Sequence, residues 1–252
     1  MRAVLLLFLL LASPLKAEEV VLGLSQDQVS ISTNFDGSEI TLYGAIKREA
    51  PIPSEDPLQV IVTISGPNEP VTVRRKDRRL GIWVNVDAVN VSSAPSFYAI
   101  ATSAPWDDVI NEADDLRHTI SIPRAIRSVG AWSQVDDPQT FIDALIRIRM
   151  NNNSYALKEG TVDLRDSTLF TTAIQMPANL TEGDYATRIF LTRGGKVISE
   201  YETSIDVRKV GLERWLFNLS RQQPLAYGIL SLAIAIAAGW GASAAFRLLR
   251  SG

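Results

Sequence analysis

The chain has 252 residues, no cysteine, one histidine and a formal net charge of −3. Without cysteine it can form no disulfide framework, no thiolate metal site and no cysteine nucleophile. A net negative charge disfavours a nucleic-acid partner, which needs a basic footprint. With one imidazole a transition-metal site is not expected, and the sequence predicts no cofactor.

Residues 1–17 have the pattern of a secretory signal peptide. Arg2 precedes the apolar residues 3–12, and Pro14 and Ala17 supply the helix breaker and the small residue expected before a cleavage site. The apolar run is too short to cross a hydrocarbon core of about 30 Å. We therefore predict cleavage after Ala17.

Residues 18–103 are predicted to begin a β-rich domain. Short segments rich in β-branched and aromatic residues alternate with turn residues such as Gly66 and Pro67. The predicted strands cover residues 20–24, 28–32, 39–46, 58–64, 71–75, 81–89 and 96–101. This spacing favours a mainly β fold, namely one or two immunoglobulin-like antiparallel sandwiches.

Residues 104–158 are predicted to form a helical insert. Apolar residues at helical spacing predict a first helix, namely Trp106, Val109, Ile110, Ala113 and Leu116. The acidic residues among them are expected to form a solvated face, namely Asp107, Asp108, Glu112, Asp114 and Asp115. These acids lack the loop spacing of calcium motifs, so the solvated face is preferred over a Ca²⁺ site.

A second helix is predicted within the same insert. Asp137 and Pro138 have the pattern of an N-cap followed by proline at the first helical position. Four apolar residues would form its buried face, namely Phe141, Ile142, Leu145 and Ile148. Asparagines 151–153 are expected to end it.

Residues 159–210 are predicted to complete the β-rich domain. The predicted strands cover residues 161–166, 169–177, 185–193 and 196–208, with Gly194 and Gly195 as a tight hairpin turn. The spacing of Leu180, Gly183 and Tyr185 resembles the corner tyrosine of immunoglobulin-like sandwiches, whose hydroxyl ties a loop to the backbone. Tyr185 is therefore expected to be structural.

The C-terminal region is predicted to anchor the chain in a membrane. Residues 211–223 have an apolar stripe that includes Trp215 and favour a juxtamembrane amphipathic helix, although a linker helix packed on the domain has the same pattern. Residues 224–246 are long and apolar enough for a single transmembrane helix, which leaves residues 247–252 as a cytoplasmic tail. Flanking arginines favour the reverse orientation, but long domains translocate largely regardless of charge. We expect a single-pass inner-membrane protein of bacteria with a periplasmic N-terminal domain.

Small residues recur every four positions within this predicted span. One such row contains Ala237, Gly241 and Ala245, and Gly239 belongs to a second row. Small residues allow close helix approach in lipid, so these positions are candidate contacts with an integral membrane partner. Alanine and glycine are also common in membrane helices generally. No pattern specifies an oligomeric state.

A basic cluster is the sharpest local feature of the acidic domain. It contains Arg74, Arg75, Lys76, Arg78 and Arg79, interrupted by one aspartate. One interpretation is a charged hairpin tip that discourages edge-to-edge strand pairing. The other is docking to anionic lipid headgroups or to an acidic partner, with Trp83 and Tyr98 as neighbouring contact aromatics. Trp83 is equally compatible with a place in the core.

The stretches NFDGSEITLYGAI (34–46), VRRKDRRLGIWVNVDAV (73–89) and PSFYAIATS (95–103), together with a C-terminal span, resemble the alphaproteobacterial putative transmembrane protein family. The likeness extends over essentially the whole chain. It implies a membrane protein of the Gram-negative envelope. It implies no catalytic residue.

These features favour a non-enzymatic, membrane-anchored periplasmic protein. We expect an accessory or interaction subunit of a membrane transporter or envelope complex, in contact with the lipid bilayer and an integral membrane protein. The alternative is a ligand-binding or sensing ectodomain, which needs an aromatic-lined pocket. A hydrolase is a third option, but His118 is the only candidate base and no Gly-x-Ser-x-Gly motif accompanies it.

Overall fold

The computed structural model describes residues 18–24, 28–31, 37–48, 56–128, 135, 137–209 and 212–250. The predicted signal peptide lies outside these residues. The chain divides into two units, one comprising residues 1–29 and 35–207 and the other residues 30–34 and 208–252. The first unit contains nearly all of the strands, and the second contains two C-terminal helices.

The first unit is built from three sheets. The four-stranded sheet has the order β1 (Glu18–Leu24), β3 (Ser38–Arg48), β10 (Leu169–Met176), β9 (Asp163–Arg165). The six-stranded sheet has the order β2 (Gln28–Ile31), β12 (Lys196–Lys209), β11 (Gly183–Arg193), β4 (Leu58–Ser65), β7 (Tyr98–Thr102), β8 (Tyr155–Lys158). The third sheet is the hairpin of β5 (Asn68–Arg79) and β6 (Ile82–Pro95).

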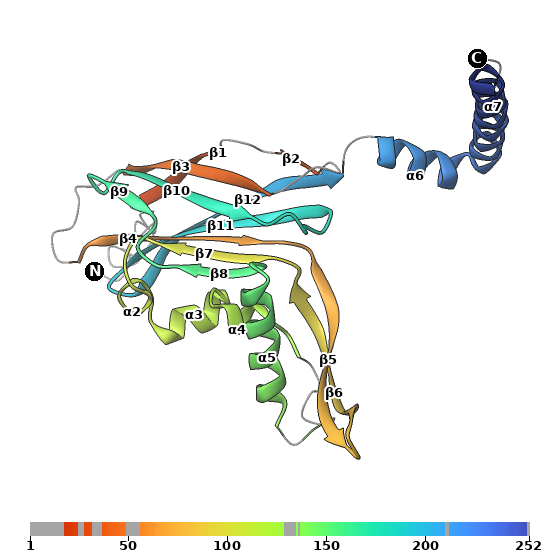
Figure 1. The fold of residues 1–252 in the computed structure, drawn as a ribbon. Helices are drawn as coiled ribbons and strands as arrows, with labels where there is room; N and C mark the ends of the chain where they lie inside the picture. Colours follow the sequence, from red (N-terminus) through yellow and green to blue (C-terminus); the bar gives the residue numbers. More distant parts are fainter. Residues whose placement is uncertain are drawn as a thin grey trace, which may run out of the picture. The chain divides into compact units, whose positions relative to one another are not determined.

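The six-stranded sheet is the middle layer of this unit. Its strand β4 is buried on both faces, because apolar residues occupy successive positions rather than alternate ones. Ile61 packs in one cluster with helix residues such as Val109 and Phe141. The alternate residues Val60 and Val62 point to the opposite face, where the four-stranded sheet lies (Figure 1).

The prediction of a mainly β fold is confirmed. Each segment predicted as a strand forms one, and β3 pairs with β10 while β4 pairs with β11, so both predicted β regions contribute to the same sheets. Gly194 and Gly195 form the predicted hairpin turn. The sequence analysis missed β8, which lies within the predicted helical insert and pairs in parallel with β7.

The prediction of one continuous first helix is wrong, because the helix is broken in two. It consists of α2 (Trp106–Val109) and α3 (Glu112–His118), separated by extended backbone at Ile110 and Asn111. The Asn111 side chain accepts a hydrogen bond from the Asp114 amide and caps α3. The break rotates the second half, so Leu116 is 61% exposed instead of buried.

The predicted solvated acidic face is also wrong for two of its residues. Asp114 and Asp115 are buried. Asp114 accepts a hydrogen bond from the Val197 amide at 3.0 Å. Asp115 accepts from the Ser121 amide at 2.7 Å and forms an ion pair with Arg124, next to the short helix α4 (Ile122–Ala125). These carboxylates hold α3 and α4 in place.

The second predicted helix is confirmed as α5 (Pro138–Asn151). Asp137 is its N-cap, Pro138 opens the first turn, and its last residue is Asn151. Hydrogen bonds from Thr140 lower the pKa of the Asp137 carboxyl. Of the predicted buried face, Phe141 and Leu145 are buried, whereas Ile148 is half exposed.

Two buried tyrosines predict a loss of stability in alkaline solution. The Tyr185 hydroxyl donates to the Thr181 carbonyl at 2.8 Å, which agrees with the structural role expected of Tyr185, and Tyr155 donates to the Pro95 carbonyl at 2.7 Å. Burial raises the pKa of each phenol from 10.0 to about 12. Their contribution to the free energy of unfolding is fully present below about pH 10, which is the pKa of tyrosine in the unfolded chain. It is lost as the pH rises through about 12, the pKa in the folded chain. Urea denaturation at stepped pH should show the free energy of unfolding falling in this window, with a shallower fall in Tyr155→Phe and Tyr185→Phe.

Candidate docking surface

The β5–β6 hairpin carries the predicted basic cluster. Its register continues to Arg79 opposite Ile82, which leaves Leu80 and Gly81 as a two-residue turn. Both turn residues have positive φ, 51° and 87°, the requirement of a type I′ turn. Glycine adopts this conformation freely, whereas a bulky residue such as leucine rarely does.

The half of the hairpin nearest the sheets is held against α5. Val73 and Val89 are buried in one apolar cluster with Phe141. The Arg75 guanidinium lies 5.7 Å from the centre of the Phe141 ring and forms an ion pair with Asp87. Arg75 therefore helps to hold the hairpin on α5.

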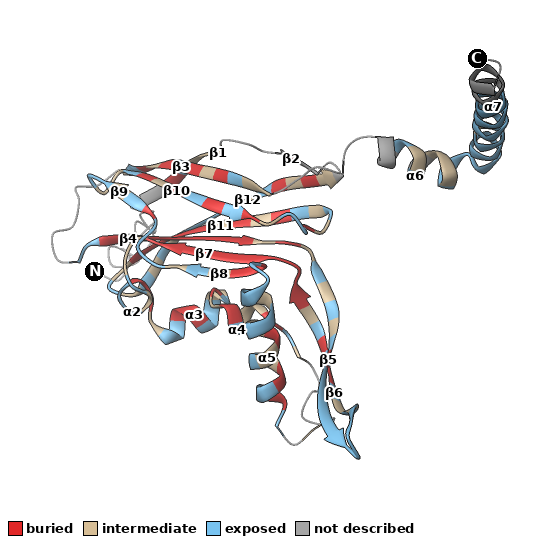
Figure 2. Ribbon diagram, in the orientation of Figure 1, coloured by how far each residue is buried: buried red, intermediate tan, exposed pale blue. Residues whose placement is uncertain are grey.

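The other half of the hairpin, residues 76–83, is exposed at every position and is called the hairpin tip below (Figure 2). Leu80 is completely exposed, and Ile82 and Trp83 are 65% and 68% exposed. Trp83 lies directly opposite Arg78, and Ile82 lies opposite Arg79. The tip therefore presents paired apolar and cationic side chains on both faces.

The charge of this region is basic within an acidic chain. Residues 74–87 carry five basic and two acidic side chains, a net charge of +3, against −3 for the whole chain. Arg79 approaches Asp77 at 3.9 Å. Among the residues that the structure describes, the side chains of Arg74, Lys76 and Arg78 make no ion pair. Their charges remain available to an external anion.

The sequence analysis found the cations of this surface but missed two of its apolar residues. Leu80 and Ile82 were not singled out. The available signal was their position on either side of Gly81, directly after a run of charged residues. Of the two alternatives for Trp83, the structure agrees with the contact position, because the side chain is exposed beside the cations. Tyr98 is not a contact aromatic, because it is buried in β7 and donates its hydroxyl to the Ile120 carbonyl at 2.7 Å.

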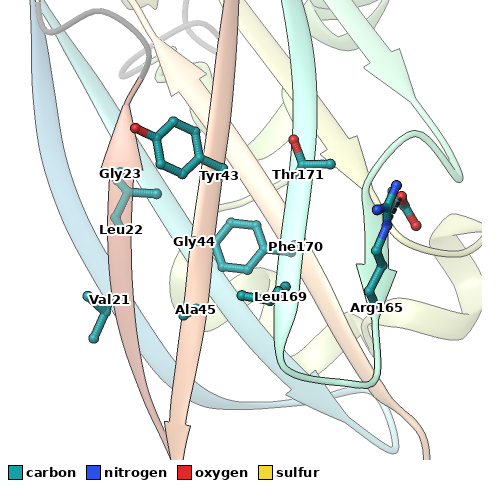
Figure 3. Close-up of a pocket in the computed structure, with 11 residues that line it drawn as sticks. Val21, Leu22, Gly23, Tyr43, Gly44, Ala45, Arg165, Leu169, Phe170 and Thr171 are labelled. Atoms are coloured by element: carbon teal, nitrogen blue, oxygen red, sulfur yellow. Dashed lines mark hydrogen bonds and ion pairs between the residues drawn. The ribbon is translucent and has the colours of Figure 1, made fainter.

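A separate recess lies on the four-stranded sheet (Figure 3). It has a volume of about 560 Å³ and lies among β1, β3, β9 and β10. Two glycines open it: a Cβ on Gly23 would stand 2.3 Å from the Tyr43 ring, and one on Gly44 would stand 2.4 Å from the Phe170 ring. Its lining is mainly apolar, with Arg165 and its ion-pair partner Asp163 at one side.

His118 lies in structural contacts. Its Nδ1 is 3.1 Å from a carboxylate oxygen of Glu200, and its ring packs edge-on against Phe190. Arg188 donates to the His118 carbonyl at 2.9 Å. Within the described ranges, no three His, Asp or Glu side chains are grouped to hold a metal ion.

The second unit contains α6 (Leu212–Gln222) and α7 (Pro224–Arg250). In α7, residues 224–243 have a mean hydropathy of 1.8 and are not buried. Among the described segments, this is the one helix long and apolar enough to cross a membrane.

A family model with the description "Putative transmembrane protein (Alph_Pro_TM)" matches residues 19–248. The chain belongs to this family. The match includes the sheets, the hairpin and almost all of α7. No curated protein matches the chain. The transmembrane family and its one apolar C-terminal helix support a single-pass membrane protein that contacts the lipid bilayer.

The predicted partner positions of this transmembrane family member lie on α7. Ala237, Gly239 and Gly241 are exposed, and an added Cβ at either glycine would meet no atom within 4 Å. Ala245 lies in the helix, but its side chain is outside the described residues. On α6, Trp215 is 52% exposed.

Proposed function

We propose that this protein is a non-enzymatic interaction subunit of a membrane transporter or envelope complex, anchored by α7. The main support for this proposal is the hairpin tip. Its leucine, isoleucine, tryptophan and cations are exposed and have no role in the described core. Exposed apolar groups rimmed by polar ones mark interaction surfaces in soluble domains. A protein confined to a membrane would use such a surface to contact another component there.

We place the β-rich domain in the periplasm and α7 in the inner membrane. The pattern of residues 1–17 supports export, and residues 224–243 at 1.5 Å per residue span about 30 Å, the thickness of a hydrocarbon core. The arginines that follow Phe246 would then lie in the cytoplasm.

We also assign the two larger sheets to an immunoglobulin-like sandwich. The order β1-β3-β10-β9 corresponds to strands A, B, E and D of such folds, and β12-β11-β4 corresponds to G, F and C. Tyr185 then occupies the corner position at the start of strand F. This architecture by itself implies no function, so the proposed role rests on the hairpin tip.

Co-purification tests the proposed function. Tagged protein extracted from its native membrane in mild detergent should retain a partner, and Lys76→Glu with Arg78→Glu should recover about tenfold less of it. Each exposed charge contact contributes on the order of 0.3–0.5 kcal/mol, and two reversals change four such contributions. The matched control is Arg147→Glu with Lys196→Glu, which makes the same charge change at exposed positions away from the tip. Recovery of the wild-type protein alone would refute the proposal.

A second candidate function is ligand binding, and the recess in Figure 3 favours it. Its volume of about 560 Å³ is within the range of small-molecule sites, roughly 300–1,000 Å³. Val21 and Leu169 would contact an apolar ligand, and the Arg165 guanidinium would select an anionic group on it. The partner role takes precedence because Arg165 already pairs with Asp163 at 2.9 Å.

A further inference from the structure

We infer that the hairpin tip binds the anionic lipid headgroups of the same bilayer that α7 enters. This inference rests on the proposed function, because it takes the tip as the docking element of a membrane-anchored protein. Leu80, Ile82 and Trp83 would enter the interfacial layer, and the neighbouring cations would contact lipid phosphates. The contact would fix how the β-rich domain is oriented on the membrane.

Strand register places the base of the hairpin at the end of the domain from which the chain continues to the C-terminal helices. Ser65, the last residue of β4, pairs with Ala186, and Val207 of β12 pairs with Gly183. The hairpin starts three residues after Ser65. It therefore leaves the six-stranded sheet at the same end from which β12 continues toward α6 and α7. The base of the hairpin is thus joined to the membrane helix through this end of the domain, and such a tether raises the effective concentration of the hairpin at the bilayer.

The side chains of the tip are those that a lipid interface selects. Cations near an anionic membrane surface gain on the order of 1 kcal/mol each, about fivefold in occupancy. Tryptophan is enriched at the headgroup level, where its ring is half in lipid and half in water. Arg78 lies opposite Trp83, so the ring can enter the interface while the guanidinium stays at the phosphates.

Leu80 gives an independent reason to infer an apolar partner. It is completely exposed and holds φ at 51°, so neither packing within the domain nor backbone preference accounts for leucine in this turn. Asparagine before glycine would suit a type I′ turn better. Unfavourable conformation at an exposed site indicates a role outside the fold.

The tip is too narrow to form a whole protein interface by itself. In the proposed complex it would be one edge of a larger protein contact, whereas lipid can be bound by the tip alone. Specific protein interfaces use about 20–30 residues on each side. The tip has only the eight residues 76–83, on two strands. A bilayer surface needs no matching shape, so a small basic and apolar projection is sufficient to bind it.

A nitroxide label on the full-length chain tests the inference. Because the natural sequence has no cysteine, Leu80→Cys gives a unique labelling site. Lys196→Cys is the matched control, because it lies on another hairpin beside Arg193, which pairs with Leu58 at the opposite end of the six-stranded sheet. Each protein is reconstituted in phosphatidylcholine vesicles with or without phosphatidylglycerol. Collisions with oxygen and with a nickel chelate, present on both sides, are measured by electron paramagnetic resonance.

We expect the label at position 80 to lose contact with nickel and gain contact with oxygen in phosphatidylglycerol vesicles. The label at position 196 should remain aqueous in both vesicles. Adding Lys76→Gln and Arg78→Gln should lower the equilibrium constant for bilayer contact by about 25-fold, fivefold for each charge removed. If the label at position 80 were as accessible to nickel as the label at position 196, the inference would be overturned.

Two further arms separate the remaining explanations. In Ile82→Cys, the added Leu80→Asn change should reduce bilayer contact while the hairpin stays folded, because asparagine suits the turn. In one arm, the protein is reconstituted in phosphatidylcholine vesicles, and separate phosphatidylglycerol vesicles are then added. If the label enters lipid only after this addition, the tip binds a second bilayer and not the one that holds α7. Burial only in native membranes with a co-purified protein would make the tip a protein interface. Lipid burial without any co-purified protein would refute the proposed function instead.

Discussion

Replacing Ala235 with aspartate should release most of the protein from the membrane. Ala235 lies near the middle of residues 224–243, where aspartate disfavours insertion by about 2.5–3.5 kcal/mol, a factor of roughly 100 in the equilibrium constant. The described residues of α7 are exposed on all sides, so no group within the described chain can pair with the new carboxylate. Carbonate extraction at high pH followed by sedimentation measures the effect: wild type should stay in the membrane pellet, and Ala235→Asp should move to the supernatant.

Two controls separate loss of insertion from loss of folding. Ala235→Leu makes the same position larger but apolar and should remain in the pellet. Gln223→Asp places the same charge directly before α7, where water and headgroups solvate it, and should also remain there. A pellet that retains Ala235→Asp would show that α7 is not held by lipid, and the proposed docking of the hairpin tip to the same bilayer would then lose its basis.

Local sequence patterns were sufficient to predict most of the strands. In β3, alternate residues are buried and the others are exposed or partly buried, so period-two alternation predicts it. The turn at Gly194 and Gly195 is specified by glycine pairs that tolerate positive φ. Strand β8 lacked such a signal, because it is four residues long and is stabilised by parallel pairing with β7, from which it is separated in the chain by helices α2 to α5.

The acidic residues of α3 were misassigned because helical periodicity was extended across a break. Ile110 adopts an extended conformation, and the helix restarts at Asn111 with a new rotational phase. The sequence contains the signal for the restart, since asparagine followed by acidic residues is a common N-terminal pattern. The burial of Asp115 also depends on Arg124 and on amides contributed by the next segment.

The cations of the candidate site could be predicted, but its apolar residues could not. A run of basic residues is visible in any sequence, whereas the exposure of Leu80 depends on the exact turn of the hairpin. Trp83 was ambiguous for the same reason, because a tryptophan in a strand is equally compatible with burial. Only the register, with Arg78 opposite Trp83, brings the two kinds of side chain together.

Removing the Asp115 carboxylate should destabilise the β-rich domain by about 3 kcal/mol. Asp115 is 6% exposed, accepts from the Ile120 and Ser121 amides, and lies 2.7 Å from the Arg124 Nε. In Asp115→Ala, both amides and the partly buried guanidinium lose their partner, and each loss adds a desolvation cost. Urea denaturation followed by tryptophan fluorescence measures the change.

The comparison with an exposed acid makes this prediction specific. Asp108→Ala removes a carboxylate from α2 that lies in solvent, and it should change the free energy of unfolding by less than about 0.5 kcal/mol. Adding Arg124→Met to Asp115→Ala should recover part of the loss, because it removes the unpaired guanidinium. If Asp115→Ala and Asp108→Ala were equally stable, the carboxylate would not hold α3 to α4. The layer that covers Ile61 and Tyr98 would then depend on apolar packing alone.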